Sequence, residues 1–375
     1  MRWDEDSPIS MQFEKGEETV RSRHGRFVGG RADGVEIVRL ETSSIAVEVL
    51  PTRGMGIHRI ESGGVRFGWR SPVKGPVHPS LVPISEPSGL GWLSGFDELL
   101  VRCGLESNGA PEHDDNGQLK FPLHGRIANT PADALEIETN EASGRLDLIG
   151  HVDEARLFFT NFRLRSRVRV HAGSGVVEVL DEVTNEGSTS ATMQMLYHIN
   201  IGLPVLDEGS ELKLPIAELA PKDRLSASEI DAWNRFAAPQ PGYQERVYFA
   251  SLQADESGMT RALLKNSKSD TGLSVAFGTK TLPRFVIWKS TAGREDGYVT
   301  GLEPATNFPN TRGYEESQGR VVSLEPEETV SFRVKLEPHT DAESVAGAEK
   351  LVDDLIDEAK AVIHRDPKPG WTPGT

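Results

Sequence analysis

Residues 157–171 read LFFTNFRLRSRVRVH, and apolar and basic side chains alternate along this stretch. One face of an extended chain would carry Phe158, Phe162, Leu164, Val168 and Val170, and the other Arg163, Arg165, Arg167 and Arg169. Because successive strand residues point to opposite faces, the pattern predicts a long strand in a large sheet, packed on one face and solvated on the other. The arginine row could hold an anion, but pairing with this chain's own carboxylates is the favoured interpretation.

The same alternation recurs in shorter segments that turn residues separate. These segments are 35–40, 44–50, 145–152, 175–185, 191–202, 272–278, 284–290 and 329–337. They predict an all-β, mainly antiparallel sandwich, and they do not alternate with helices as a doubly wound α/β fold would. We expect only a few short helices, at 226–236 and 341–364. No repeat or linker divides the chain, so a single domain is predicted over residues 1–365, followed by a mobile tail at 366–375.

Composition narrows the function. The 375 residues carry a formal net charge of −16, which disfavours nucleic acid as a partner. No apolar run is long enough to span a membrane, and MRWDEDSPIS does not resemble a signal peptide, so a cytoplasmic location is expected. The single Cys103 excludes an intramolecular disulfide and a CxxC motif. Nucleotide-binding and tight metal-ligand motifs are absent from the sequence, so we expect neither a cofactor nor a metal, although a metal site built from distant histidines stays open.

Residues 192–202 (TMQMLYHINIG) divide cleanly into two faces. The face expected to pack between sheets carries Met193, Met195, Tyr197, Ile199 and Ile201. Gln194, His198 and Asn200 lie on the other face, with Leu196 between them. Amides supply both donors and acceptors, which a polyol requires. This face is therefore a candidate binding surface, although a plain solvated sheet face is an equally good interpretation of the segment alone.

Two further segments place polar groups beside glycine. In KFPLHGRIAN (120–129), His124 and Arg126 are two residues apart and would point the same way on a strand, with Gly125 allowing close approach of a chain or ligand. In GYVTGLEPATNFP (297–309), Glu303 is expected to end a strand before Pro304, and Gly301 leaves space beside the carboxylate. A surface turn and a surface glutamate are the plainer alternatives.

Four other residues are weaker candidates. Arg53 lies in TRGMGIH, and Asp97 and Arg102 lie in GFDELLVRCG. Trp288 could stack against a sugar ring, because an indole face offers apolar area to C–H groups, although most such tryptophans belong to the core.

The ordered set HisGly at 124–125, His198 on a strand and GluPro at 303–304 resembles the aldose 1-epimerase (galactose mutarotase-like) superfamily. Further segments resemble one uncharacterised branch of it: PTRGM (51–55), CGL (103–105), LHGR (123–126), LYHINIG (196–202) and LPRFVIWK (282–289). The resemblance covers about residues 35–337. It departs from the characterised enzymes at Leu196-Tyr197, where they carry Thr-Asn.

The resemblance implies a β-supersandwich whose concave sheet holds a sugar, and an isomerase that interconverts sugar anomers without a cofactor. It implies that Glu303 is the general base, that His198 is the general acid and that His124 holds the sugar near its ring oxygen. Asp97 is a candidate for the family's substrate-gripping aspartate. Asn200 and Trp288 are further candidate contacts, and Arg53, Arg102 and Arg126 could grip a sugar acid or a sugar phosphate.

The expected mechanism places an acid and a base on opposite sides of the sugar. We expect Glu303 to be ionised and His198 protonated, with the histidine pKa raised and the glutamate pKa lowered by their proximity. Two alternatives stay open: a non-catalytic sugar-binding protein on the same scaffold, and a carbohydrate lyase or hydrolase, although a glycosidase usually needs two carboxylates and only one is evident. The identity of the sugar and the oligomeric state are not determined by the sequence.

Overall fold

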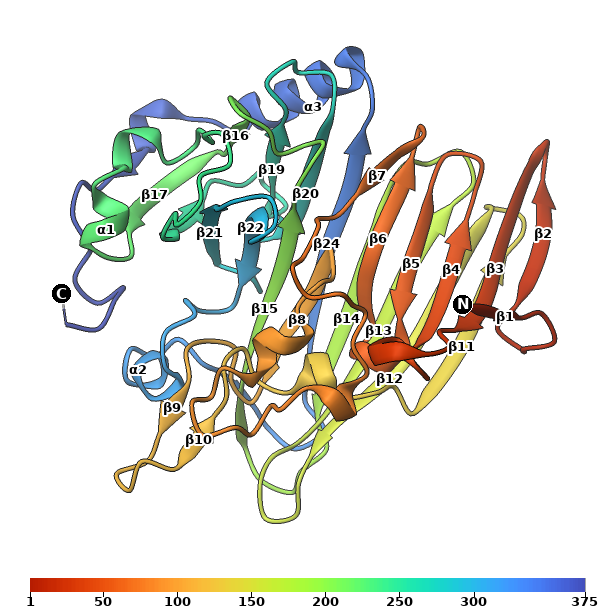
Figure 1. The fold of residues 1–375 in the computed structure, drawn as a ribbon, viewed down its shortest axis with the longest axis horizontal. Helices are drawn as coiled ribbons and strands as arrows, with labels where there is room; N and C mark the ends of the chain where they lie inside the picture. The colour runs from red at the N-terminus through yellow and green to blue at the C-terminus, as the bar shows by residue number, and fades with distance from the viewer. Residues whose placement is uncertain (375) are drawn as a thin grey trace.

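The computed structural model describes residues 1–374, in which two stacked, mainly antiparallel sheets form the body of the protein (Figure 1). The larger sheet runs in the order β1 (Arg2–Asp4), β3 (Glu18–Arg26), β4 (Glu36–Glu41), β5 (Ala46–Leu50), β6 (Gly56–Ser62), β8 (Leu100–Leu105), β15 (Ala191–Ile201), β22 (Tyr298–Ala305), β21 (Arg284–Thr291), β18 (Arg246–Leu252), β17 (Ile216–Pro221) and β25 (Val362–Ile363). Three strands pair beside this path: β2 (Met11–Lys15) with β3, β7 (Val65–Phe67) with β6, and β23 (Val322–Leu324) with β15.

The smaller sheet lies behind the larger one, and Figure 1 shows β11–β14 behind β4–β6. Its order is β11 (Ala134–Asn140), β12 (Arg145–Ala155), β13 (Asn161–His171), β14 (Val177–Asn185), β24 (Thr329–His339), β20 (Gly272–Gly278), β19 (Met259–Lys265) and β16 (Glu211–Lys213). A separate hairpin joins β9 (Glu112–His113) to β10 (Leu119–Phe121). The described helices are α1 (Arg224–Ala227), α2 (Arg312–Ser317) and α3 (Ala342–Asp353). The all-β sandwich predicted from the alternating segments is confirmed.

The arginine-rich strand is β13, and its two faces behave as predicted. Phe162, Leu164, Val168 and Val170 are fully buried in the core between the sheets. The arginines pair with carboxylates on neighbouring strands: Arg163 with Asp153, Arg165 with Glu182, and Arg167 and Arg169 with Asp147. The strand begins only at Asn161, so Phe158 is not part of the apolar face. It lies in a turn at φ 71° and is almost fully exposed.

One buried ion pair connects the two sheets. Arg102 on β8 donates to both carboxylate oxygens of Asp181 on β14, at 2.5 and 3.1 Å, and neither side chain is exposed. The guanidinium also donates to Ser166 and to the backbone oxygen of Met55, while Tyr197 donates to Asp181. A buried charge must be paired and hydrogen-bonded to be tolerated. Arg102 is therefore a structural residue of the core and does not reach the outer face of the sheet.

The helices are shorter than predicted. The segment expected to be helical over 226–236 is the single turn α1, capped by Asp223, followed by a 3-10 turn at Ile230–Ala232. The segment expected over 341–364 is helical only to Asp353. The side chain of Gln253 donates to the backbone oxygen of Asp357 and accepts from its N–H, and β25 then pairs with β17. These sheet contacts compete with continuation of the helix.

The segment from residue 366 packs against the domain as far as Gly374. Trp371 is only 7% exposed, and its ring lies 4.8 Å from that of Phe308. Its backbone oxygen accepts from Asn310, and Arg320 donates to the oxygen of Gly370. The prediction of a mobile tail does not fit these contacts. The last residue of the predicted tail, Thr375, lies outside the described residues.

Candidate active site

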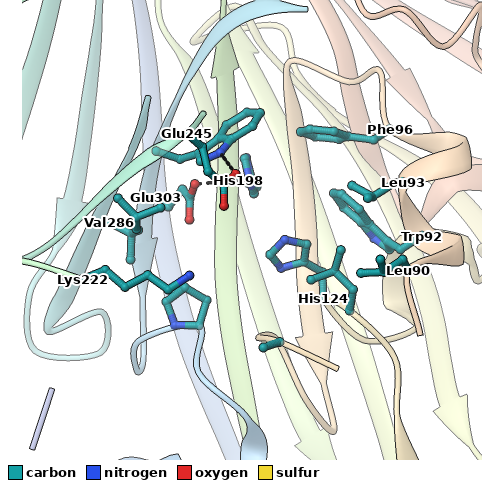
Figure 2. A pocket seen from close by; sticks show the side chains of 15 residues that line it. Leu90, Trp92, Leu93, Phe96, His124, His198, Lys222, Glu245, Val286 and Glu303 are labelled. Carbon is teal, nitrogen blue, oxygen red and sulfur yellow. Dashed lines mark hydrogen bonds and ion pairs between the residues drawn. The ribbon is translucent and has the colours of Figure 1, made fainter. Parts of the chain in front are cut away.

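A cavity of about 270 Å³ opens on the outer face of the larger sheet, over β15, β22, β21 and the end of β17 (Figure 2). Its volume lies just below the roughly 300–1,000 Å³ usual for small-molecule sites, which suits a small ligand of monosaccharide size. The side chains that line it are Leu90, Trp92, Leu93, Phe96, Ala110, Leu123, His124, His198, Lys222, Glu245, Val247, Val286, Trp288, Glu303 and Pro309.

His198 and Glu303 meet at the floor of this cavity. They project from the neighbouring strands β15 and β22, where Asn200 is paired with Gly301, and His198 Nε2 lies 3.2 Å from Glu303 Oε1. Gly301 makes this contact possible, because a Cβ at that position would lie 2.5 Å from Glu303 Oε1 and 2.9 Å from His198 Cε1. The space predicted beside Glu303 is thus filled by the partner histidine. The two groups lie side by side on one wall, not on opposite sides of the cavity as expected.

Burial governs the charge of this pair. Both side chains are almost inaccessible to solvent, at 4% and 2% exposure. Burial, together with nearby His124, lowers the pKa of His198 well below its usual value. Burial and nearby Glu245 raise the pKa of Glu303 well above its usual value, while Lys222 opposes this shift. Both directions are opposite to those expected, because loss of hydration outweighs the attraction within the pair. Burial therefore shifts both groups toward their uncharged forms.

His124 faces the same cavity from a turn, not from a strand. It adopts φ 57°, and its Nδ1 lies 2.9 Å from the backbone oxygen of Asn108. A carbonyl oxygen can only accept, so Nδ1 carries the proton, and burial lowers the pKa of His124 to about 4. At neutral pH the ring is uncharged, and its Nε2 is a hydrogen-bond acceptor. Gln194 supports this arrangement by accepting from the N–H of Asn108.

Aromatic rings form the wall around His198. The ring of Phe96 lies 5.1 Å and that of Trp288 5.3 Å from the His198 ring, both nearly edge to face, while Trp92 lies 4.6 Å from His124. Trp288 Nε1 donates to Glu245 at 2.7 Å, which fixes the indole and places a second carboxylate at the cavity (Figure 2). The apolar faces and edges suit the C–H surface of a sugar ring.

Lys222 brings a cation to the opposite side of the cavity from Phe96 and Trp92 (Figure 2). It follows the last residue of β17, Pro221, directly. Within residues 1–374 it forms no ion pair or side-chain hydrogen bond, although its charge acts on both Glu303 and His124. Its three N–H groups are therefore free to donate to a ligand.

Several predicted contacts lie elsewhere. Arg53 is buried in an ion pair with Glu98 at 2.9 Å and donates to the backbone oxygen of Gly95. Arg102 is the inter-sheet residue described above. Asp97 is buried near His58, on the far side of Phe96 from the cavity lining. None of these three residues lines the cavity, because Arg53 and Arg102 are held by buried carboxylates and Asp97 lines a different cavity.

Arg126 and Asn200 also do not line the cavity. The turn at His124–Gly125 breaks the strand register that would have pointed Arg126 the same way as His124, and the charge of Arg126 acts on Glu154 instead. Gly125 approaches the backbone of Gly104 and Ser107, not a ligand. The side chain of Asn200 donates to the backbone oxygens of Glu98 and His198, so it positions β15. The strand of Glu303 also continues through Pro304 to Ala305.

The sequence analysis missed Trp92, Phe96, Lys222 and Glu245. Trp92 lies in a 3-10 helix at Gly91–Gly95, with Phe96 directly after it, and the other two lie in connections beside strands. Such segments carry no period that marks a facing direction. The aromatic density of GWLSGF was the one available signal.

No three histidine, cysteine, aspartate or glutamate side chains in residues 1–374 converge in a way that could hold a metal ion. In the same part of the chain, no helix has the length and apolar character needed to cross a bilayer.

Known proteins share this fold and part of its sequence. Residues 32–337 match the family described as Domain of unknown function (DUF4432). A crystal structure from Klebsiella pneumoniae, provisionally named an aldose 1-epimerase, is 31% identical, with 96% of this chain and 94% of that chain aligned and a TM-score of 0.91. No protein with a curated description matched the sequence.

More distant structures share the fold alone. A galactose mutarotase-like protein from Clostridium acetobutylicum is 15% identical, over 84% of this chain and 98% of its own, with a TM-score of 0.57. Galactose 1-epimerase from Lactobacillus acidophilus is 15% identical, over 86% and 99% of the two chains, with a TM-score of 0.56.

The sandwich and its outer-face cavity define a galactose mutarotase-like protein of the aldose 1-epimerase superfamily. Within that superfamily, the chain belongs to the family described as a domain of unknown function (DUF4432). The match covers about four-fifths of the chain.

Proposed function

We propose that this protein binds a sugar of monosaccharide size in the cavity and interconverts its α and β anomers, with Glu303 and His198 as base and acid. The observation that carries the proposal is the 3.2 Å contact between these two groups at the floor of a cavity with aromatic walls. A carboxylate and an imidazole held together in a dry, sugar-sized space are suited to moving protons and require no cofactor.

The side-by-side arrangement fits the chemistry of ring opening. The anomeric hydroxyl must lose a proton while the ring oxygen gains one, and both oxygens are bonded to the same carbon. Two adjacent groups on one wall can therefore serve both oxygens. Rotation about the next carbon–carbon bond presents the other carbonyl face, and the reverse proton transfers close the ring.

For this chemistry, His198 and Glu303 must together carry one exchangeable proton that either group can hold. In the proposed step, Glu303 accepts the anomeric proton while His198 donates to the ring oxygen. This assignment uses the form in which the shared proton is on His198. The cation of Lys222 lowers the pKa of Glu303 and so favours that form, and hydroxyl donors of a bound sugar act in the same direction. Ligand binding thereby offsets the effect of burial, which shifts the pair toward its uncharged forms.

The remaining polar groups hold the sugar hydroxyls. The uncharged Nε2 of His124 accepts from a hydroxyl, and Lys222 donates to one. Glu245, already oriented by Trp288, accepts from another. Leu90, Leu93 and Phe96 close the opposite side with apolar surface.

Glu245 also keeps glycoside cleavage as a second candidate function. A hydrolase needs two carboxyl groups at the scissile bond, and Glu245 provides the second one in this cavity. Its hydrogen bond to Trp288 assigns it to positioning in our proposal. Mass spectrometry of incubated di- and monosaccharides separates the two functions, because anomer exchange leaves the mass unchanged.

Saturation-transfer NMR across a panel of free sugars, sugar acids and sugar phosphates tests the proposal. We expect at least one member to exchange its anomers faster with protein than in buffer. A control with Glu256→Gln, an exposed glutamate in a distant turn, should match the wild type. Absence of acceleration for every sugar, with binding still detected, would favour the non-catalytic alternative.

A further inference from the structure

A second cavity, of about 320 Å³, lies on the far side of Phe96 from the candidate active site. Its basic lining comes from β6, β7 and the segment that follows them: Arg59, Arg66, Arg70 and Lys74. Trp69, His58 and Asp97 complete much of the wall. Four cations around one hollow are unexpected on a chain whose net charge is −16.

Among the described residues, three of these cations lack an ion-pair partner. Arg59 pairs with Glu48 at 2.8 Å. Arg66, Arg70 and Lys74 form no ion pair or side-chain hydrogen bond with any residue in 1–374. Burial lowers the pKa of Arg66, and the nearby positive charge of Arg59 lowers it further. Glu48 and Glu61 only partly oppose these shifts. An anion between these groups would relieve their repulsion.

The inner end of the cavity holds polar atoms that lack partners. Asp97 Oδ1 and His58 Nδ1 are buried and form no hydrogen bond within the described chain, and the carboxyl of Asp97 lies 3.9 Å from His58. Burial and the adjacent Glu98 raise the pKa of Asp97 well above its ordinary value, which shifts its carboxyl toward the protonated form. A protonated carboxyl donates a hydrogen bond to an anion and does not repel it. Unsatisfied buried polar atoms in a native protein call for a partner.

We propose that this cavity binds a small molecule through a phosphate-class oxyanion, held by Arg66, Arg70 and Lys74. Guanidinium groups bind phosphate through paired N–H donors, and the lysine adds a point charge. The cavity is as large as the candidate active site, so it has room for an organic group beside the anion.

The two cavities share a wall. The rings of Trp69 and Phe96 lie 4.9 Å apart, and Ser71, from the second cavity, donates to the backbone oxygen of Phe96 at 2.7 Å. Trp69 Nε1 also donates to the oxygen of Glu98. An occupant of the second cavity therefore contacts residues that hold the wall of the first. The proposal does not depend on anomer exchange, because it concerns binding alone.

Isothermal titration calorimetry with sodium phosphate, at fixed ionic strength maintained with sodium chloride, tests the proposal. The wild type should show saturable binding. The double variant R70Q/K74Q should weaken it about tenfold or more, since each charged hydrogen bond contributes strongly. The matched control is K268Q/R294Q, which removes two exposed cations that are distant in sequence and outside both cavities. It should bind phosphate as the wild type does.

Glucose 6-phosphate and glucose form the second arm of the titration. Tighter binding of glucose 6-phosphate than of phosphate, lost in R70Q/K74Q, identifies an organic phosphate as the ligand class. Equal affinities for glucose 6-phosphate and inorganic phosphate identify free phosphate as the ligand. The proposal is overturned if phosphate gives no saturable heat, if both double variants weaken binding equally, or if glucose 6-phosphate binds R70Q/K74Q as tightly as the wild type.

Discussion

Gly301→Ala is the substitution whose effect the structure defines best. The glycine does not adopt a positive φ, so alanine is compatible with the backbone, and the consequence is purely steric. Its Cβ would lie 2.5 Å from Glu303 Oε1 and 2.9 Å from His198 Cε1, whereas ordinary contact begins at 3.4 Å. To reach ordinary contact with the new Cβ, the carboxylate must therefore move by about 0.9 Å and the imidazole by about 0.5 Å, which disturbs their present contact.

The magnitude follows from these displacements. A misplacement of about 1 Å in an active site can cost about 10²-fold in rate, which corresponds to about 2.7 kcal/mol of barrier. Overpacking of this kind costs about 1–3 kcal/mol of stability, which a protein of ordinary stability survives. We expect a folded protein whose anomer exchange is about a hundredfold slower.

The assay is saturation-transfer NMR with the sugar that exchanges fastest in the panel, and circular dichroism verifies folding. Gly278→Ala is the matched control, since it too lies on a strand, and its Cβ would meet only Met259 Sδ at 3.9 Å. A folded Gly301→Ala protein that exchanges anomers within about threefold of the wild type would refute the reasoning, because the pair would not need its present geometry.

Three further predictions concern residues around the site. Arg102→Met should lower the free energy of unfolding by about 3–5 kcal/mol in urea, because the substitution leaves Asp181 buried and unpaired. The sugar affinity of the folded fraction should not change. A changed affinity would contradict the structural role of Arg102. Trp288→Phe should weaken sugar binding about fivefold or more in NMR titrations, because Glu245 loses its orienting donor, and unaltered binding would remove Glu245 from the site. Burial lowers the pKa of His58 to about 3, so below about pH 6.5 the unfolded chain binds a proton that the folded chain does not, and the free energy of unfolding falls as the pH falls. His58→Gln should therefore remove about 2 kcal/mol of the stability that the wild type loses between pH 7 and pH 5 in urea unfolding. An unchanged loss of stability in this variant would contradict the pKa shift.

Strand periodicity predicted the scaffold well. The alternation in 192–202 assigned each side chain of β15 to the correct face: the residues from Met193 to Ile201 at odd positions are in the core, and His198 faces the cavity. The same principle succeeded for the arginines of β13. Period-two patterns are reliable here because a one-residue error would turn every buried side chain to solvent.

Turns and burial limited the prediction of the site. Arg126 was assigned to the face of His124 by strand spacing, but His124 and Gly125 both adopt positive φ and redirect the chain. Arg53 and Arg102 looked like ligand contacts because a sequence does not show which carboxylate will pair with a buried arginine. Their partners, Glu98 and Asp181, become visible only when the sheets are stacked.

The pKa shifts of His198 and Glu303 run opposite to the predicted directions for a physical reason. Proximity alone would raise the pKa of His198 and lower that of Glu303, but burial opposes both shifts and is the larger effect. The extent of burial depends on Trp92 and Phe96, which approach from a loop without periodic pattern. Desolvation was therefore not predictable from the strand segments themselves.

Anomer exchange in Glu303→Gln is the most direct test of the proposed function. The amide keeps the shape of the side chain but cannot accept the anomeric proton, so exchange should fall by about 10²–10⁴-fold. Sugar binding, followed by NMR titration, should stay within a few fold of the wild type. Exchange close to the wild-type rate, in a variant that still binds the sugar, would contradict the account and remove Glu303 from the chemistry.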